Sequence, residues 1–329
     1  MQVYIVSKID LKVRDASKAI GFEINEDTAG PILSAFQFAT AVNISSGDYI
    51  FLKDKYLGIV AGIEADKSTS VVTLRALPIS SIFVRKILLG DIQTVTEDYI
   101  NATILNNFVS SGDSLLDIPY INVIVKTQTP LGIIPHNEHG IFNLDTFLRY
   151  VAKRHSIYTE LDLNADSLNV TIEQRMPPVH IIDATVADVI SLNETVVSES
   201  VSKVTVKTPH LLETYYMFED GTYGADPDAG MRVPGRAETV YCENDDDIQK
   251  SAGDIFAKNK YSHSIETEII SASKLYDVKN MRLYDKAKVK TKTGIYETYI
   301  SARYQKSTAA TVLFKFGDAK LSLTDKLKS

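Results

Sequence analysis

The stretch SGDYIFLKDKYLGIV, residues 46–60, decides the fold class. Two runs of apolar, β-branched and aromatic residues flank the polar triplet at 53–55, a pattern that predicts a β-hairpin. A second polar turn follows at 66–68, and residues 71–76 return as a third strand. Pro78 ends this meander, because proline cannot donate a hydrogen bond to a central ladder.

Toward the N-terminus, alternation predicts one strand over residues 3–13, so the first ~90 residues are expected to be all-β. Beyond the meander, residues 96–108 carry apolar side chains at helical spacing. Residues 143–155 predict a second helix, whose last turn is basic and complements the helix dipole. The other elements expected in this middle region are a strand at 120–127, a hairpin at 157–163 and 168–173, and a short helix at 184–192.

The chain becomes β-rich again from residue 201. Glycine, proline and aspartate are frequent in residues 219–235, which predicts a long loop. Asp245, Asp246 and Asp247 are expected to cap a helix that runs to about Lys260. The strands expected here lie at 201–207, 211–218, 262–270, 287–291, 295–304 and 311–316.

These elements predict an α+β, mainly β chain, in which two β-barrel-like domains flank or enclose a mixed α/β middle domain. We expect an N-terminal β-meander or barrel domain at 1–92 and a mixed domain at 93–200. A β-rich domain with one embedded helix follows at 201–329. The domains can be discontinuous in sequence.

Composition narrows the class of protein. The 329 residues include 44% hydrophobic and 23% charged residues, as in ordinary soluble globular chains. No apolar run reaches the ~20 residues that cross a bilayer, so we expect no membrane span. The alternating N-terminus is typical of a strand rather than a signal peptide. The only cysteine, Cys242, excludes an internal disulfide framework and any cysteine-based zinc site.

Charge is distributed unevenly along the chain, whose net charge is −7. From Lys274 onward there are 13 Lys and Arg against 5 Asp and Glu, and the preceding residues hold 22 against 37. An acidic body with a basic final segment could join head to tail with its own copies, bind nucleic acid, or carry ordinary solvated strand faces. Lys286, Lys288, Lys290 and Lys292 lie on one face of one strand, as expected of an edge strand protected against aggregation.

Candidate ligand-binding residues are few. His136 and His139 lie between a proline and a glycine, where a polar loop is favoured over a metal site because no third ligand is evident. Asp226 and Asp228 resemble part of a calcium loop, but such loops need about six oxygen ligands. Cys242 has no neighbouring histidine to activate it and is expected to be a small core residue.

The basic C-terminal strands also carry Tyr284, Tyr296, Tyr299 and Tyr304 among the lysines. Interleaved aromatic and cationic side chains are typical of sheets that bind single-stranded nucleic acid. Regular spacing on one face is equally expected of a solvated strand, and the acidic balance of the whole chain opposes binding to phosphate. The common nucleophile, zinc and phosphate motifs are missing. We therefore predict no enzyme activity, no catalytic or metal-binding residue and no cofactor.

Three stretches carry a resemblance to a known family: the meander at 46–60 with its continuation to 73–75, NLDTFLRYV at 143–151 with its hairpin YTELDL at 158–163, and the helix and strands from 247 to 317. In this order they resemble the tail hub proteins of long-tailed phages, a family related to contractile-phage baseplate hubs and prophage tail-associated proteins. The resemblance spans nearly the whole chain and no single signature carries it.

The resemblance implies a homotrimer in which two β-domains per copy alternate around a pseudo-sixfold ring at the virion tail tip. The ring would join a hexameric distal tail protein or tail tube, meet the C-terminus of the tape measure protein, and adjoin tail fibres or receptor-binding proteins. DNA would pass through its channel without specific binding, and the protein would be made in the bacterial host cytoplasm. The alternative is a carbohydrate-recognising receptor-binding or cell-surface protein, with the loop at 219–235 as its site.

Overall fold

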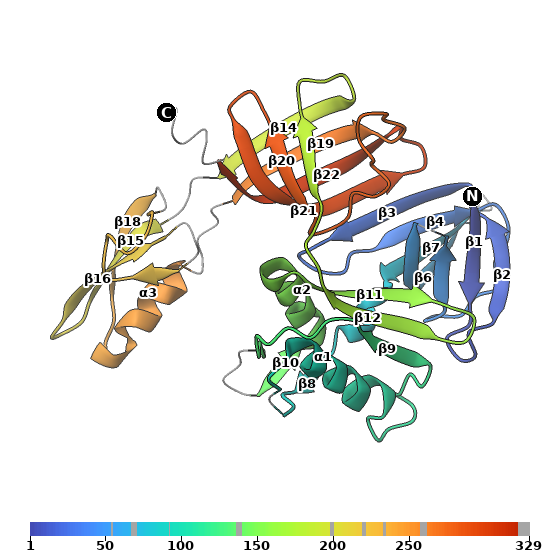
Figure 1. Ribbon diagram of the computed structural model, residues 1–329, viewed down its shortest axis with the longest axis horizontal. Helices are drawn as coiled ribbons and strands as arrows, with labels where there is room; N and C mark the ends of the chain where they lie inside the picture. Colours follow the sequence, from blue (N-terminus) through green and yellow to red (C-terminus); the bar gives the residue numbers. More distant parts are fainter. Residues whose placement is uncertain are drawn as a thin grey trace.

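The computed structural model describes residues 1–329 except 54, 67–70, 92, 136–139, 198–200, 219–221, 233–234, 257–261 and 322–329. Strands hold 47% of the residues and helices 15%, which confirms the predicted mainly β class. A sheet of 13 strands joins both ends of the chain (Figure 1). A three-stranded sheet with two helices, a two-stranded pairing and a four-stranded unit complete the fold.

Seven strands form the N-terminal part of the large sheet. They are β1 (Gln2–Val6), β2 (Val13–Lys18), β3 (Gly21–Asp27), β4 (Ser34–Phe38), β5 (Tyr49–Leu52), β6 (Tyr56–Asp66) and β7 (Val71–Pro78), paired in the order β3-β4-β7-β6-β5-β1-β2. The predicted hairpin is β5–β6, with Tyr49 opposite Ile59. Gly58 allows a close approach there, because a Cβ atom would lie 2.5 Å from the Leu77 carbonyl oxygen.

The single strand expected over residues 3–13 is wrong. β1 ends at Val6, and β2 begins at Val13 after a tight turn. The Ser7 N–H donates to the Lys12 carbonyl, and Leu11 adopts a left-handed φ of 55°. The alternation of apolar residues continues through this turn by chance. Leu11 is buried but Ile9 is 76% exposed, so the two residues do not share one strand face.

The middle region packs helices on a small sheet, as predicted. Its elements are a 3₁₀ turn (Ile79–Phe83), β8 (Lys86–Leu88), α1 (Thr96–Ile104), a π-helical turn (Leu105–Val109), β9 (Ile121–Val125), β10 (Ile141–Asn143), α2 (Leu144–His155), β11 (Ile157–Leu163) and β12 (Leu168–Gln174). Asn143 caps α2 by accepting a hydrogen bond from Thr146 N at 3.2 Å, and Ser156 ends the helix in a left-handed conformation.

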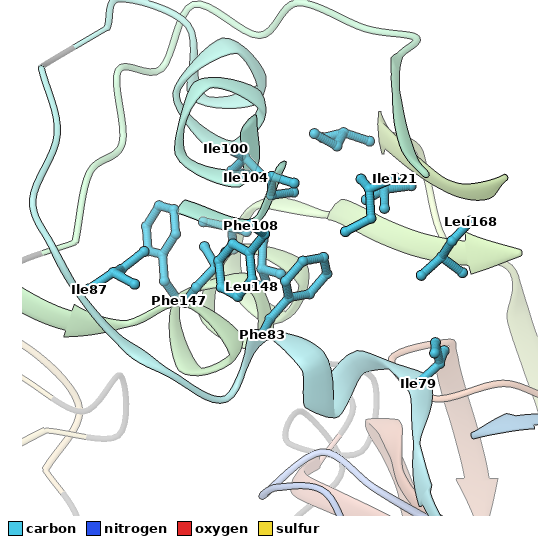
Figure 2. Packing of buried hydrophobic residues seen from close by; sticks show 14 of the residues in the cluster. Ile79, Phe83, Ile87, Ile100, Ile104, Phe108, Ile121, Phe147, Leu148 and Leu168 are labelled. Atoms are coloured by element: carbon cyan, nitrogen blue, oxygen red, sulfur yellow. The ribbon is translucent and has the colours of Figure 1, made fainter. Parts of the chain in front are cut away.

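Figure 2 shows the apolar core of this middle region, where side chains of both helices meet the 3₁₀ turn. The rings of Phe83 and Phe108 cross edge to face with centroids 5.2 Å apart. Tyr49 extends this core into the N-terminal strands, and its hydroxyl lies 2.7 Å from that of Tyr120. The middle region and the N-terminal strands therefore share one packed interior.

The C-terminal part of the large sheet contains β13 (Val179–Asp183), β14 (Val189–Val197), β19 (Ser262–Ile270), β20 (Lys286–Lys290), β21 (Ile295–Lys306) and β22 (Thr311–Leu321). The helix expected at 184–192 is wrong, because 184–188 form a turn and β14 follows it. Val189, the first residue of that strand, is buried in the C-terminal core. β-Branched residues at such positions favour a strand once β19 supplies a partner.

A four-stranded unit is inserted in sequence between β14 and β19. It contains β15 (Val201–Lys207), β16 (Leu212–Met217), β17 (Tyr223–Gly224), β18 (Arg236–Tyr241), a 3₁₀ turn (Asp245–Asp247) and α3 (Ile248–Phe256). The three aspartates form the 3₁₀ turn rather than a cap, and Asn244 precedes them at the cap position. The sheet order thus joins β13 and β14, from the expected middle domain, to strands beyond residue 260. The domain boundaries at 92 and 200 themselves stay a prediction.

Candidate assembly surfaces

The residues considered for ligand chemistry do not form one site. His136 and His139 lie outside the described residues. Asp226 accepts a hydrogen bond from Asp228 N at 3.0 Å, which is a local turn. In the part of the chain that the structure describes, no three His, Cys, Asp or Glu side chains form a group able to hold a metal ion. Cys242 is half-buried against the core of the inserted unit and donates to the Asn244 carbonyl at 3.3 Å.

The four C-terminal tyrosines are engaged within the fold. Tyr296 is buried in the C-terminal core. Tyr304 donates to the Asp27 carboxylate at 3.2 Å. Lys153 from α2 lies over the ring of Tyr299, 5.1 Å from its centroid. Burial raises the pKa of Tyr284 to about 12, although the nearby Arg149 opposes the shift. These side chains do not form a row of exposed stacking platforms.

The lysine strand is not an edge strand, contrary to expectation. β20 pairs with β21 on one side and with β13, in parallel, on the other. Lys288 contacts Glu297 at 3.0 Å, and Lys290 contacts Asp183 at 2.8 Å. These lysines face solvent, as predicted, and two of them pair with carboxylates of the neighbouring strands.

The two β-rich parts meet along one strand. The first half of β21 pairs with β20, whereas its last residues pair with β3, with Tyr304 opposite Asn25. Arg303 reinforces this seam by contacting the Glu26 carboxylate at 3.0 Å. A shared strand therefore joins the two parts by main-chain hydrogen bonds.

Helix α2 is tied to the same seam. Arg149 contacts Asp145, one turn earlier, at 2.7 Å and donates to the Asp27 main-chain carbonyl at 2.7 Å. Both side chains of the pair are largely buried. The guanidinium therefore links the helical region to the end of β3.

β13 has a partly open edge with apolar side chains. Among the described strands only β20 pairs with it, and the Tyr276 hydroxyl forms hydrogen bonds with the main chain of Asp183 at the end of the other edge. Lys286 N donates to the Pro178 carbonyl, so by parallel alternation the main-chain groups of Val179 and Ile181 face the other edge. Ile181 is 72% exposed, and Met176, just before the strand, is 90% exposed. Soluble monomers normally protect such an edge, so this one is a candidate contact with another polypeptide.

The sequence missed β13 because only two apolar residues alternate after a pair of prolines, and proline within a run argues against a strand. The alternation of Val179 and Ile181 is the one feature of this stretch that favours a strand. No helix within the described residues is long and apolar enough to span a bilayer.

Comparison by sequence finds no matching protein family and no matching curated protein. Comparison of structures finds matches over nearly the whole chain. The 43 kDa tail protein of prophage MuSo2 from Shewanella oneidensis aligns over 98% of both chains, with a TM-score of 0.53 and 13% identity. The chain has the fold of a phage tail protein.

Two further structures extend this result. The tail protein from Neisseria meningitidis MC58 aligns over 98% of this chain and 96% of its own, with a TM-score of 0.51 and 13% identity. A chain of the phage P2 baseplate in its activated conformation aligns over 94% of this chain and 91% of its own, with a TM-score of 0.54 and 12% identity. The predicted resemblance is thus confirmed at the level of the fold, while the low identity transfers no residue roles.

Proposed function

We propose that this chain is the structural, non-catalytic hub of a phage or prophage tail tip. In this proposal three copies form a ring that joins the hexameric tail tube, or a distal tail protein, to the tip of the virion tail. The observation that carries it is the agreement in fold with phage tail and baseplate chains along nearly the full length of both partners.

The seam along β21 supports this role. A ring that caps a sixfold partner with three subunits needs two β-rich faces in each copy, held at a fixed spacing. The strand shared between β20 and β3 supplies such a fixed spacing. The open apolar edge of β13 supports contact with another polypeptide.

The remaining partners follow from the same role. The ring would meet the C-terminus of the tape measure protein and the tail fibres or receptor-binding proteins. DNA would pass through the centre without specific binding, because the net charge of −7 opposes retention of phosphate. Synthesis would take place in the host cytoplasm before assembly into the virion.

Mass measurement and imaging of the purified chain test the proposal. We expect particles of three copies of 36.5 kDa, and a threefold ring with a central hole in single-particle images. Addition of the cognate tail tube or distal tail protein should give a complex of one ring on one hexamer. A chain that stays monomeric at all concentrations and ignores the tube protein contradicts the proposal.

A further inference from the structure

One sheet face of the inserted unit turns away from α3, and Arg232 from the segment after β17 packs on one end of it. α3 packs on the opposite face, where Ile248 and Ala252 join Val204 in the core. Side chains alternate across each strand, so the other face shows Lys203, Thr205 and Lys207 from β15. The register places Tyr216, Thr214 and Leu212 of β16 on one side of them, and Ala237, Thr239 and Tyr241 of β18 on the other.

This outward face is positively charged. Lys203 and Lys207 are exposed, and neither pairs with a carboxylate among the described residues. The Arg232 guanidinium stacks on the Tyr216 ring, 5.2 Å from its centroid. The outward positions of β15, β16 and β18, all of which the structure describes, include no carboxylate.

The carboxylates of these strands lie on the α3 side. Glu213 accepts a hydrogen bond from Tyr215 at 2.6 Å, on the face that packs against α3. Glu238 stands opposite Val204, also on that face. The separation of charge between the two faces is therefore built into the alternation of the strands.

Apolar groups border the cations. The register puts Leu212 and Tyr241 on either side of Lys207, and these two side chains are 63% and 65% exposed. Exposed apolar area around a few cations is typical of a protein contact surface, in which the apolar groups lose water and the charges select the partner.

The same unit carries the complementary charge at one end. Glu243, Asp245, Asp246 and Asp247 line an open depression together with His210. Glu243 and Asp246 are exposed. The acidic turn at 243–247 therefore presents carboxylates that a partner can reach.

We propose that the outward face of β15, β16 and β18 binds the acidic turn at 243–247 of a neighbouring copy. This inference rests on the proposed trimer, and it names one contact between its subunits. A contact between two different surfaces of the same chain is heterologous, and such a contact forms a ring when the rotation between successive copies closes, as the proposed trimer requires. Each copy would donate one basic face and one acidic turn.

A nucleic acid or another long polyanion fits this face less well. Tyr216 is already stacked by Arg232, so the face lacks a succession of free aromatic platforms. Cys242 N donates to the Lys207 carbonyl, which holds the start of the acidic turn against the end of the face. A polyanion running past Lys207 would meet these carboxylates, whereas a compact acidic turn can sit on the face alone.

Charge reversal and its rescue test the contact. In the full chain, Lys203→Glu with Lys207→Glu should weaken trimer formation at least about tenfold, measured by mass photometry over a dilution series. Asp245→Lys with Asp246→Lys should weaken it similarly. The variant with all four substitutions should recover most of the loss. Lys12→Glu with Lys53→Glu, an equal change of charge in two turns between the N-terminal strands, serves as the control.

The outcomes separate this inference from the hub proposal. A monomeric wild-type chain overturns both. A wild-type trimer that both reversals leave intact overturns the contact and spares the hub. Loss of the trimer in both reversals without recovery in the fourfold variant also overturns the contact. Circular dichroism and urea unfolding of each variant establish that the inserted unit is folded. If the Lys203→Glu, Lys207→Glu variant instead loses affinity for a single-stranded oligonucleotide while trimers persist, the face is a polyanion site.

Discussion

Replacing Arg149 with methionine tests how the helical region is tied to the β-seam. The substitution keeps much of the apolar stem and removes the contacts to Asp145 and to the Asp27 carbonyl. The exposed fractions of the Arg149 and Asp145 side chains are 18% and 8%, so methionine would leave a nearly buried carboxylate without its cation. Breaking a buried pair costs about 3–5 kcal/mol, and the residual exposure of Arg149 places the expected loss near 3 kcal/mol.

Urea unfolding, followed by tyrosine fluorescence because the chain has no tryptophan, measures this loss. With a slope of about 3 kcal/mol per molar urea, the midpoint should fall by about 1 M. Asp145→Asn combined with Arg149→Met should recover more than about 1 kcal/mol of the loss, because no unpaired charge stays buried. Arg154→Met, an exposed arginine of the same helix, is the control and should change stability by less than about 0.5 kcal/mol. Equal effects of Arg149→Met and Arg154→Met would refute the reasoning.

Other substitutions test packing, charge and the open edge. Phe83→Ala should cost about 3–5 kcal/mol of unfolding free energy in urea titrations, whereas Leu115→Ala, at an exposed position, should cost less than about 0.5 kcal/mol. The pKa of Asp183 is lowered to about 2, mainly by the hydrogen bond from Lys290, so its contribution to stability is present above about pH 4 and is lost as the pH falls toward 2. Lys290→Met should raise the pKa of Asp183 toward its ordinary value in NMR titrations, and an unchanged titration would contradict that cause. Ile181→Lys should leave the unfolding midpoint unchanged and weaken trimers or tail complexes in mass measurements; intact assembly would remove β13 from the interface.

Local elements could be predicted from the sequence because their determinants are neighbours in the chain. The hairpin β5–β6 follows from two apolar runs around a polar triplet, and α2 begins at the capping Asn143. The pairing of β21 with β3 joins Arg303 to Glu26 across nearly the whole chain, and no local period encodes that partner. The turn at 184–188 was mistaken for helix because the supporting strand, β19, lies far ahead in the sequence.

The candidate surfaces were harder to predict than the fold. In the sequence, Val179 and Ile181 look like core residues, and only the structure shows that their side chains are exposed. The outward face of the inserted unit cannot be predicted from the sequence, because its few cations lie within an acidic stretch. Only the register, which sends Glu213 and Glu238 to the α3 side, reveals that face as positive.

The uneven charge of the sequence suggests a basic C-terminal segment that is available to a partner, but several of its lysines are paired within the fold. Several lysines of the basic C-terminal segment pair with carboxylates of adjacent strands. These pairs are Lys288 with Glu297, Lys290 with Asp183, Lys306 with Glu23 and Lys315 with Glu266. Three of these carboxylates come from before Lys274, so the opposite charges of the two segments meet within the sheet. The cations of the proposed contact, Lys203 and Lys207, stand on the inserted unit, inside the part of the sequence that is acidic overall. The head-to-tail contact that we propose therefore depends on how the strands sort charge between their faces, rather than on the net charge of either segment.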